Sequence, residues 1–443
     1  MTALLERCFH LRHNATTART EILAGLTTFL TMSYIIVVNP AILSDAGMPF
    51  AGVLLATVLV SALSSIFMGL YANLPYALAP GMGINAFFTY TLVLGHGMPW
   101  PAALGAVFVS GIVFFILTVT RVRTLIVEAI PGPLRFAVAA GIGFFLTLIG
   151  LQKAGVVVTH PVTMVTFGGL NVQTAIFFIG LIVTGALVIG RVKGALVLGI
   201  LLTSLLALAV SPVAVAQGWL QAPLASPPQA VVQRPSLDVM LKLDLAAALS
   251  LGMILPVFSL LFVDLFDSLS TLLGVAQVAG MIDRNGQPRN LDRALIVDSF
   301  ATAIAGLTGS SSGTTYIESA AGVEEGGRTG LTAVVAGLLF LPFMFFSPLL
   351  QFVPAVATAP VLVLIGVYMV TPLRQIAWKN FEEAIPAFLA IVMIPLTYSI
   401  TQGIVWGFLV YTALKLLRGR AREVHWMLYI IDVLAIVALV SAR

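Results

Sequence analysis

The chain has 443 residues, of which 59% are hydrophobic and only 9% are charged. Soluble domains carry about 25% charged residues, so this composition excludes a soluble globular protein and indicates that most of the surface faces lipid. The Lys and Arg residues behind the net charge of +4 are dispersed in short loops, which argues against a nucleic-acid-binding protein. The single cysteine, Cys8, excludes an intramolecular disulfide framework and a cysteine-based metal site.

Fourteen apolar segments are predicted to be membrane spans, because about 20 apolar residues cross the roughly 30 Å hydrocarbon core as a helix. In chain order they cover residues 20–43, 51–71, 75–94, 100–120, 132–151, 173–190, 194–216, 246–274, 291–307, 314–325, 329–346, 354–370, 383–400 and 402–417. Prolines and glycines interrupt the third segment, and the tenth is too short to span alone, so both are predicted to be discontinuous. A further apolar run, 424–441, carries Asp432 at its middle and is interpreted as a helix at the interface or against the bundle.

The basic residues support this count and orient the chain, since cytoplasmic loops collect Lys and Arg. With a cytoplasmic N-terminus, 18 of the 22 Lys and Arg residues fall on the cytoplasmic side, Arg121, Arg123 and Arg284 among them, and Arg443 is left unassigned. The three outer residues are Lys153, Arg234 and Lys242. The polar first twenty residues do not fit a cleavable signal peptide. We therefore expect a multi-pass protein of the cell membrane with both termini cytoplasmic.

The chain divides into two halves of seven spans. Residues 1–217 form the first half, a polar, proline-rich outer linker covers 218–243, the second half covers 244–417, and 418–443 form a cytoplasmic or interfacial tail. Because seven is odd, the second half enters the membrane from the opposite side. This is the inverted-repeat arrangement of transporters whose solute sites lie at the midplane between discontinuous helices. The third and tenth segments occupy equivalent places in the two halves, which predicts the site there.

Four acidic residues fall inside predicted spans, namely Asp264, Asp267, Asp298 and Glu318. Each costs roughly 2.5–3.5 kcal/mol to insert, so such groups are expected to face the bundle interior or a water-filled cavity. Asp264 and Asp267 are spaced i, i+3 and share one helix face with Ser268. Two carboxylates this close resist simultaneous ionisation, so the pair could take up and release a proton. The alternative is that both only bond the backbone at a broken helix.

The discontinuous segments supply the other candidate ligands. In the tenth, the β-branched and aromatic run 314–317 favours an extended stretch, and Glu318 falls in the first turn of a short helix, where free N–H groups point toward the cavity. A simple capping carboxylate is the alternative. In the third, Gly83 lets the backbone approach a solute and Asn85 offers a donor and acceptors, although both residue types also serve helix packing. Asp298 is expected to bond backbone or hydroxyl groups of the tenth segment.

The sequence lacks the residue patterns that metal binding, ATP hydrolysis and enzyme catalysis require. No group of His, Cys or carboxylate residues has metal-ligand spacing, and there is no phosphate-binding Gly-Lys loop. Neither a metal, a cofactor nor ATP hydrolysis is therefore predicted. A membrane-embedded enzyme would need a nucleophile–base pair or a metal cluster, and because neither is visible, no catalytic residue is predicted.

Long motifs occur in order along nearly the whole chain. They comprise the Asp264–Asp267 segment and residues 20–34 (TEILAGLTTFLTMSY), 79–88 (APGMGINAFF), 315–322 (TYIESAAG), 327–330 (GRTG) and 393–400 (MIPLTYSI). At these residues the sequence resembles the purine permeases similar to the fungal azaguanine transporter, within the nucleobase–ascorbate (uracil/xanthine permease) superfamily. Carboxylates suit a purine, because they accept strong hydrogen bonds from its ring and exocyclic N–H groups.

The resemblance implies an all-α integral membrane protein with fourteen spans in a seven-plus-seven inverted repeat. It implies a core domain from spans 1–4 and 8–11, a gate domain from spans 5–7 and 12–14, and short strands in spans 3 and 10. The implied purine-contacting residues are Gly83, Asn85, Asp264, Thr315 and Glu318. The residues implied to support binding or proton coupling are Asp267, Ser268 and Asp298. It also implies a homodimeric purine–proton symporter.

Two other kinds of transporter remain open. One carries another nucleobase, such as xanthine or uracil. The other is an anion carrier of the same fold, for which a cationic or neutral pocket is expected instead of one that carries carboxylates.

Overall fold

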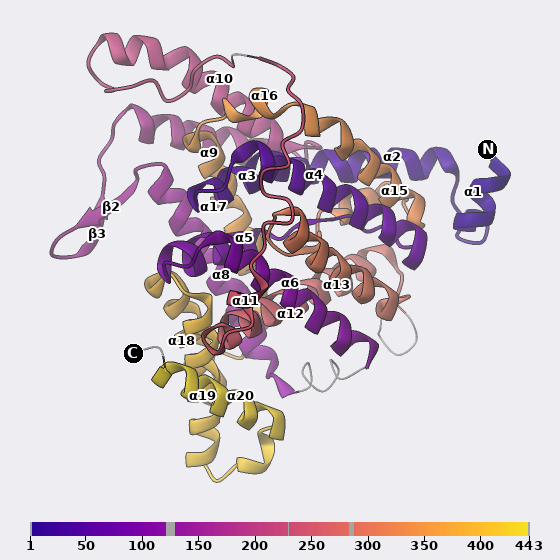
Figure 1. The fold of residues 1–443 in the computed structure, drawn as a ribbon, viewed down its shortest axis with the longest axis vertical. Helices are drawn as coiled ribbons and strands as arrows, with labels where there is room; N and C mark the ends of the chain where they lie inside the picture. The colour runs from indigo at the N-terminus through magenta and orange to yellow at the C-terminus, as the bar shows by residue number, and fades with distance from the viewer. Residues whose placement is uncertain (1, 121–128, 229, 283–287, 442–443) are drawn as a thin grey trace.

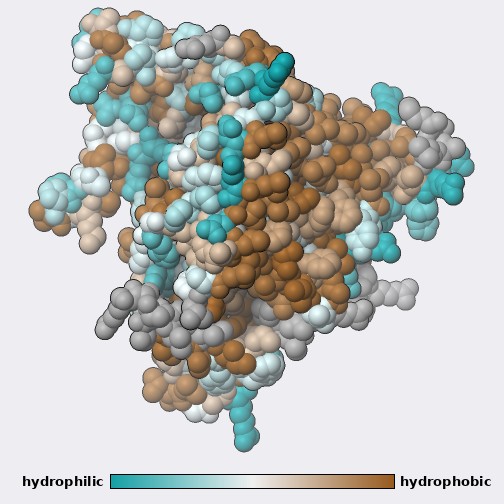
Figure 2. All heavy atoms as spheres, viewed as in Figure 1, coloured by the Kyte–Doolittle hydropathy of each residue, from teal (hydrophilic) through white to brown (hydrophobic). Residues whose placement is uncertain are grey.

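The computed structural model describes residues 2–120, 129–228, 230–282 and 288–441, and these are predominantly helical (Figure 1). Nine helices of the described chain are long and apolar enough to cross a membrane. Figure 2 shows a broad hydrophobic area where α2, α4, α13 and α15 lie in Figure 1, and Leu23, Leu63 and Leu338 are among the exposed side chains of these helices. A mostly helical membrane protein is thereby confirmed. Arg121, Arg123, Arg284 and Arg443 lie outside the described residues.

The elements follow the predicted segments closely. Up to residue 216 they are α1 (Thr2–Phe9), α2 (Ala18–Met32), α3 (Ile35–Asp45), α4 (Phe50–Phe67), the π-helix η1 (Met68–Ala72), β1 (Leu78–Pro80), α5 (Met82–Ala86), the π-helix η2 (Phe87–Gly95), α6 (Trp100–Val119), α8 (Gly132–Lys153), β2 (Val157–His160), β3 (Met164–Phe167), α9 (Val172–Ile189) and α10 (Ala195–Ala216). The segment predicted as one helix over 20–43 is two helices, α2 and α3, and the antiparallel β2–β3 hairpin was not predicted.

The rest of the chain is organised in the same way. Its elements are α11 (Leu245–Ala248), η3 (Leu251–Met253), α12 (Ile254–Ala279), α13 (Leu291–Thr308), β4 (Gly313–Thr315), α14 (Ser319–Glu324), α15 (Gly330–Phe340), η4 (Leu341–Phe345), α16 (Ser347–Gln351), α17 (Ala355–Val370), η5 (Thr371–Gln375), α18 (Phe381–Thr397), α19 (Ile400–Leu417), η6 (Ala421–Glu423) and α20 (Trp426–Ser441); η3 to η6 are 3-10 turns. The linker 218–243 contains no helix or strand in its described residues.

Each of the third and tenth segments consists of a short strand followed by a short helix. β1 and β4 pair antiparallel, with Leu78 opposite Thr315 and Pro80 opposite Gly313, and both strands are fully buried. Inside a membrane every backbone polar group needs a partner from the protein. The pairing supplies these partners, and the Ser65 hydroxyl both donates to the Leu78 carbonyl (3.1 Å) and accepts from the Leu78 N–H (2.9 Å).

Packing divides the long helices into two groups. In one group, α6 packs on α13 and α12, α15 packs on α2 and α4, and α3 packs on α4. In the other group, α8 packs on α17 and α18, α18 packs on α19, and α9 and α10 pack on each other and on α17. Contacts between the groups are sparser and include α5 with α8 and α12 with α19. The strands β1 and β4 contact α4, α12 and α13, so they belong to the first group.

Glycines let helices of the first group approach backbone to backbone, as small residues do in membrane proteins. A Cβ atom on Gly330 of α15 would lie 1.9 Å from the carbonyl oxygen of Gly69 in η1. A Cβ atom on Gly322 of α14 would lie 2.1 Å from the Thr28 hydroxyl of α2. Because α14 directly follows Glu318, the second approach fixes the position of that carboxylate against α2 and α3.

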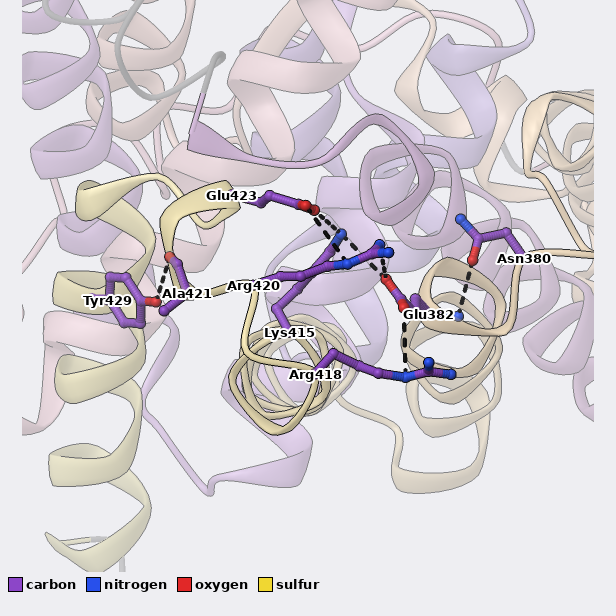
Figure 3. A network of polar contacts seen from close by, with 8 residues as sticks. All are labelled: Asn380, Glu382, Lys415, Arg418, Arg420, Ala421, Glu423 and Tyr429. Atoms are coloured by element: carbon purple, nitrogen blue, oxygen red, sulfur yellow. Dashed lines mark hydrogen bonds and ion pairs between the residues drawn. The ribbon is translucent and has the colours of Figure 1, made fainter.

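The chain ends in a hairpin of α19 and α20. Figure 3 shows the ion-pair network at the turn of this hairpin. Glu382 forms ion pairs with Lys415 (3.4 Å) and Arg420 (3.1 Å), and Glu423 forms one with Lys415 (2.6 Å). The hydrogen bond from Lys415 lowers the pKa of Glu423 below its usual value. α20 packs on α12 and α19, which agrees with a helix against the bundle. Asp432 is buried there, and neither of its carboxylate oxygens has a hydrogen-bond partner within the described chain.

Candidate functional site

The predicted site residues lie around the paired strands β1 and β4. α12 brings Asp264, Asp267 and Ser268, α13 brings Asp298, and β4 ends at Thr315. Gly83 and Asn85 lie in α5, directly after β1, and Glu318 is the residue before the first turn of α14. Residues from both halves of the sequence therefore meet at one place, because the two strands pair.

Asp264 is held in a buried cluster of hydroxyl groups. Its side chain is 1% exposed, and Oδ2 accepts a hydrogen bond of 2.5 Å from the Thr302 hydroxyl of α13. Thr302 in turn lies 2.8 Å from the hydroxyl of Ser312. Asp264 Oδ1 has no hydrogen-bond partner among the residues that the structure describes. Since buried polar atoms are nearly always paired, this oxygen can either accept a hydrogen bond from a solute or bind a proton.

Asp298 and Ser268 connect β4 to its two neighbouring helices. Asp298 is fully buried, and its Oδ1 accepts a hydrogen bond of 2.9 Å from the Thr315 hydroxyl. The hydroxyls of Ser268 and Thr314 lie 2.9 Å apart. Consecutive side chains of β4 thus bond α13 and α12, as successive side chains of a strand point to opposite faces. Thr315 contacts Asp298 here, so both residues hold the strand in place.

Asp267 and Glu318 form the less buried part of the site. Both side chains are partly exposed, and their carboxylates lie close enough for their charges to interact. Glu318 Oε1 accepts a hydrogen bond of 2.7 Å from the hydroxyl of Tyr34, at the start of α3. The structure gives no direct contact between Asp264 and Glu318 in its described residues, so Asp267 is the aspartate that faces Glu318.

The α5 residues face two different directions. Asn85 is fully buried, and its Oδ1 accepts a hydrogen bond from the Ser311 hydroxyl. A Cβ atom on Gly83 would lie 2.7 Å from Ile142 of α8 and 3.7 Å from Met369 of α17. Gly83 therefore lies where the first helix group meets the second, and its lack of a side chain allows that close approach.

Sequence reasoning predicted Ser268 and Thr315 but missed four other hydroxyl residues of the site. Tyr34, Thr302, Ser311 and Ser312 all bond a predicted site residue or its neighbour. Ser, Thr and Tyr are frequent in membrane helices as packing and bonding groups, so their presence carries little signal. One signal was available for Tyr34, which is the last residue of the 20–34 motif, a segment that contains five threonine and serine residues.

One cation lies near the acidic cluster. The Arg135 guanidinium of α8 lies 5.6 Å from the ring centroid of Phe266, the residue before Asp267. Its Nε atom has no hydrogen-bond partner within the described part of the chain. No group of His, Cys, Asp and Glu residues suited to a metal ion occurs among the described residues. The site is therefore an acidic and hydroxyl-rich one, with a single arginine stacked on its rim.

Comparisons with known proteins identify the family of the chain. A model of the xanthine/uracil permeases, described as "Permease family", matches residues 19–406, and the chain belongs to this family. It is 42% identical to the adenine permease AdeP of Escherichia coli over 440 residues, which cover 99% of this chain and 96% of that one. It is 39% identical to the guanine/hypoxanthine permease PbuO of Bacillus subtilis over 436 residues, which cover 97% and 99% of the two chains.

The fold is also similar to that of a solved transporter. The transmembrane domain of the cyanobacterial bicarbonate transporter BicA superposes with a TM-score of 0.64 at 14% identity, covering 88% of this chain and 97% of that one. At this identity the likeness concerns the fold alone. The chain is thus a membrane permease of the nucleobase transporter superfamily and not an enzyme.

Proposed function

We propose that this permease carries purine nucleobases across the cell membrane as a secondary active transporter coupled to protons. The observation that carries the proposal is the identity of about 40% over nearly the full chain to permeases named for adenine and for guanine and hypoxanthine. The site supports it, because partly exposed carboxylates can accept the N–H groups of a purine in charge-assisted hydrogen bonds.

The same site argues against an anion carrier of this fold. Asp264, Asp267 and Glu318 would repel an anion, and among the described residues the guanidinium of Arg135 stacks on Phe266 and forms no ion pair with a carboxylate. We propose the contacts given above for the purine: Asp264 and Glu318 as acceptors, Asn85, Gly83 and Thr315 beside them, and Asp267, Ser268 and Asp298 in support of binding or proton coupling.

We propose alternating access by movement of one helix group against the other. The group that contains β1 and β4 corresponds to a core domain of spans 1–4 and 8–11, and the other to a gate domain of spans 5–7 and 12–14. This division extends the nine clear spans to fourteen in a seven-plus-seven inverted repeat, with the shorter and broken helices before α20 as the remaining spans and α20 as an additional helix outside the repeat. Assembly as a homodimer is part of the same proposal and is supported by the resemblance to the superfamily.

Uptake into proteoliposomes tests the substrate directly. Radiolabelled hypoxanthine should enter liposomes that contain the purified permease, and unlabelled adenine, guanine or hypoxanthine in excess should compete. Uracil and bicarbonate should not compete, because neither presents the purine pattern of donors. Competition by uracil or xanthine alone would assign another nucleobase, and uptake of bicarbonate would favour the anion carrier.

The orientation of the chain is open to a separate test. The basic loops support a cytoplasmic N-terminus. The position of α20, however, predicts a C-terminus on the outer side of the membrane, whereas the sequence predicted a cytoplasmic one. α20 runs antiparallel to α19: its Tyr429 hydroxyl bonds Ala421 next to the turn, and Ala435 shares a cavity of about 20 Å³ with Ile404 and Ile254. Its 16 residues are nearly as long as the 18 of α19, so α20 should return across the membrane.

Reporter fusions in a bacterial host distinguish the two positions of the C-terminus. Alkaline phosphatase fused after residue 443 should be active, and green fluorescent protein at the same place should be dark. A fluorescent N-terminal fusion serves as the control for a cytoplasmic end. A bright C-terminal fusion would instead place α20 at the cytoplasmic surface.

A further inference from the structure

The break between α2 and α3 forms part of the site. α2 ends at Met32, α3 begins at Ile35, and the N–H groups of Ile36 and Val37 bond the carbonyls three residues before them. Tyr34 stands at this break and is 2% exposed. Its position beside the broken third and tenth segments is unexpected from the sequence, which predicts one continuous helix over 20–43.

Glu318 is surrounded by tyrosines, but only one of them bonds its carboxylate. The Tyr34 hydroxyl donates to Oε1 at 2.7 Å, across 284 residues of sequence. The neighbouring Tyr316 has its ring centroid 6.4 Å from that of Tyr34, yet its hydroxyl donates to the carbonyl oxygen of Pro80 at 2.6 Å. Tyr368 of α17 lies within electrostatic range of Glu318 and is 45% exposed.

We propose that Tyr34 is a positioning residue for purine binding, which fixes the Glu318 carboxylate so that its second oxygen receives an N–H group of the substrate. This inference rests on the proposed function. A carboxylate on a side chain with several rotatable bonds loses conformational freedom when it binds a ligand, and a fixed partner removes much of that cost in advance. The donor is buried, and α14, which directly follows Glu318, is held against α2 by the close approach of Gly322 to Thr28.

The two tyrosines provide a matched pair of variants. Tyr34→Phe and Tyr316→Phe each remove one hydroxyl from adjacent buried rings, but only the first removes a hydrogen bond to Glu318. Hydrogen bonds to charged groups are among the stronger ones, so Tyr34→Phe should raise the KM for hypoxanthine roughly tenfold. Its Vmax should change less than about threefold, because chain folding and the moving helix groups remain intact. Tyr316→Phe should leave the KM within about threefold of the parent protein, since the Tyr34 hydroxyl still donates to Glu318 in that variant.

The measurement is radiolabelled uptake into proteoliposomes, with equilibrium binding to the purified protein and size-exclusion chromatography as controls for folding. An unchanged KM in Tyr34→Phe, an effect confined to Vmax, or an equal rise of KM in both variants would overturn the inference. Loss of folded protein in Tyr34→Phe alone would also overturn it, by assigning the hydroxyl a structural role. Failure of the proposed function is recognised separately, because the parent protein itself would then not take up a purine.

Discussion

Replacing Glu318 by alanine should lower purine affinity by about a hundredfold or more, because the substrate then loses its charged acceptor and its N–H group is left unpaired in a buried site. The folded protein should persist, since Glu318 is partly exposed and its carboxylate is bonded by the Tyr34 hydroxyl alone among the described residues. Equilibrium binding of hypoxanthine to the purified variant measures the effect.

The matched control is Glu325→Gln, at the other end of α14. Glu325 forms an exposed ion pair with Lys193 at 2.7 Å, and exposed pairs contribute little to stability. Its replacement should leave purine binding unchanged. Unchanged affinity in Glu318→Ala would show that the site lies elsewhere.

The same experiment on α12 separates two aspartates. Asp264→Ala is expected to abolish binding and to leave the chain folded, in keeping with a free Oδ1 atom that can accept from the substrate. Asp267→Asn should have the smaller effect if its role is support. The reverse order, with binding lost in Asp267→Asn only, would make Asp267 the acceptor, which its position opposite Glu318 also allows.

Purine accumulation should depend on a proton gradient, which is the second large effect that we expect. Four carboxylates, those of Asp264, Asp267, Asp298 and Glu318, lie in one region shielded from water, where like charges repel and each buried charge is costly. A proton that enters with the purine would relieve this repulsion, so uptake and protonation should be coupled.

Uptake of hypoxanthine by cells that express the permease should therefore rise as the outer solution is made acidic, and a protonophore should abolish accumulation. In proteoliposomes, an inward proton gradient should drive accumulation above the equilibrium level, and collapse of the gradient should return it to that level. Accumulation that persists without any proton gradient would remove the coupling from the proposal and leave the purine site in place.

Much of the fold follows from local features of the sequence. The apolar runs place most of the long helices within a few residues of those observed, because the length of a span is set by bilayer thickness; α12 is the exception, since it begins at Ile254 and not at 246. Pro80 and the glycines around it indicate the broken third segment, and the β-branched run 314–317 indicates an extended stretch that overlaps β4. The family resemblance is confirmed by the match over residues 19–406.

Other features depend on contacts that the sequence does not encode locally. The break at Tyr34 lies in a stretch, residues 26–39, that contains no glycine or proline to indicate the end of a helix. Asp264 and Asp267 are equivalent by pattern, yet one bonds Thr302 inside the bundle and the other faces Glu318. The sequence of 424–441 fits either an interfacial helix or a helix packed on the bundle. Its antiparallel contact with α19 shows that it packs on the bundle.

The sequence by itself determined that the protein lies in a lipid bilayer and where most of its helices lie. It also identified the acidic residues whose burial in a membrane is costly and therefore indicates a function. Hydrophobic length and the cost of a buried charge are properties of single segments, so they can be recognised without a structure. Only the tertiary structure decided which acidic and hydroxyl groups meet, because hydrogen bonds such as that between Tyr34 and Glu318 join residues 284 positions apart. They form when β1 and β4 pair and the helices that carry them pack together.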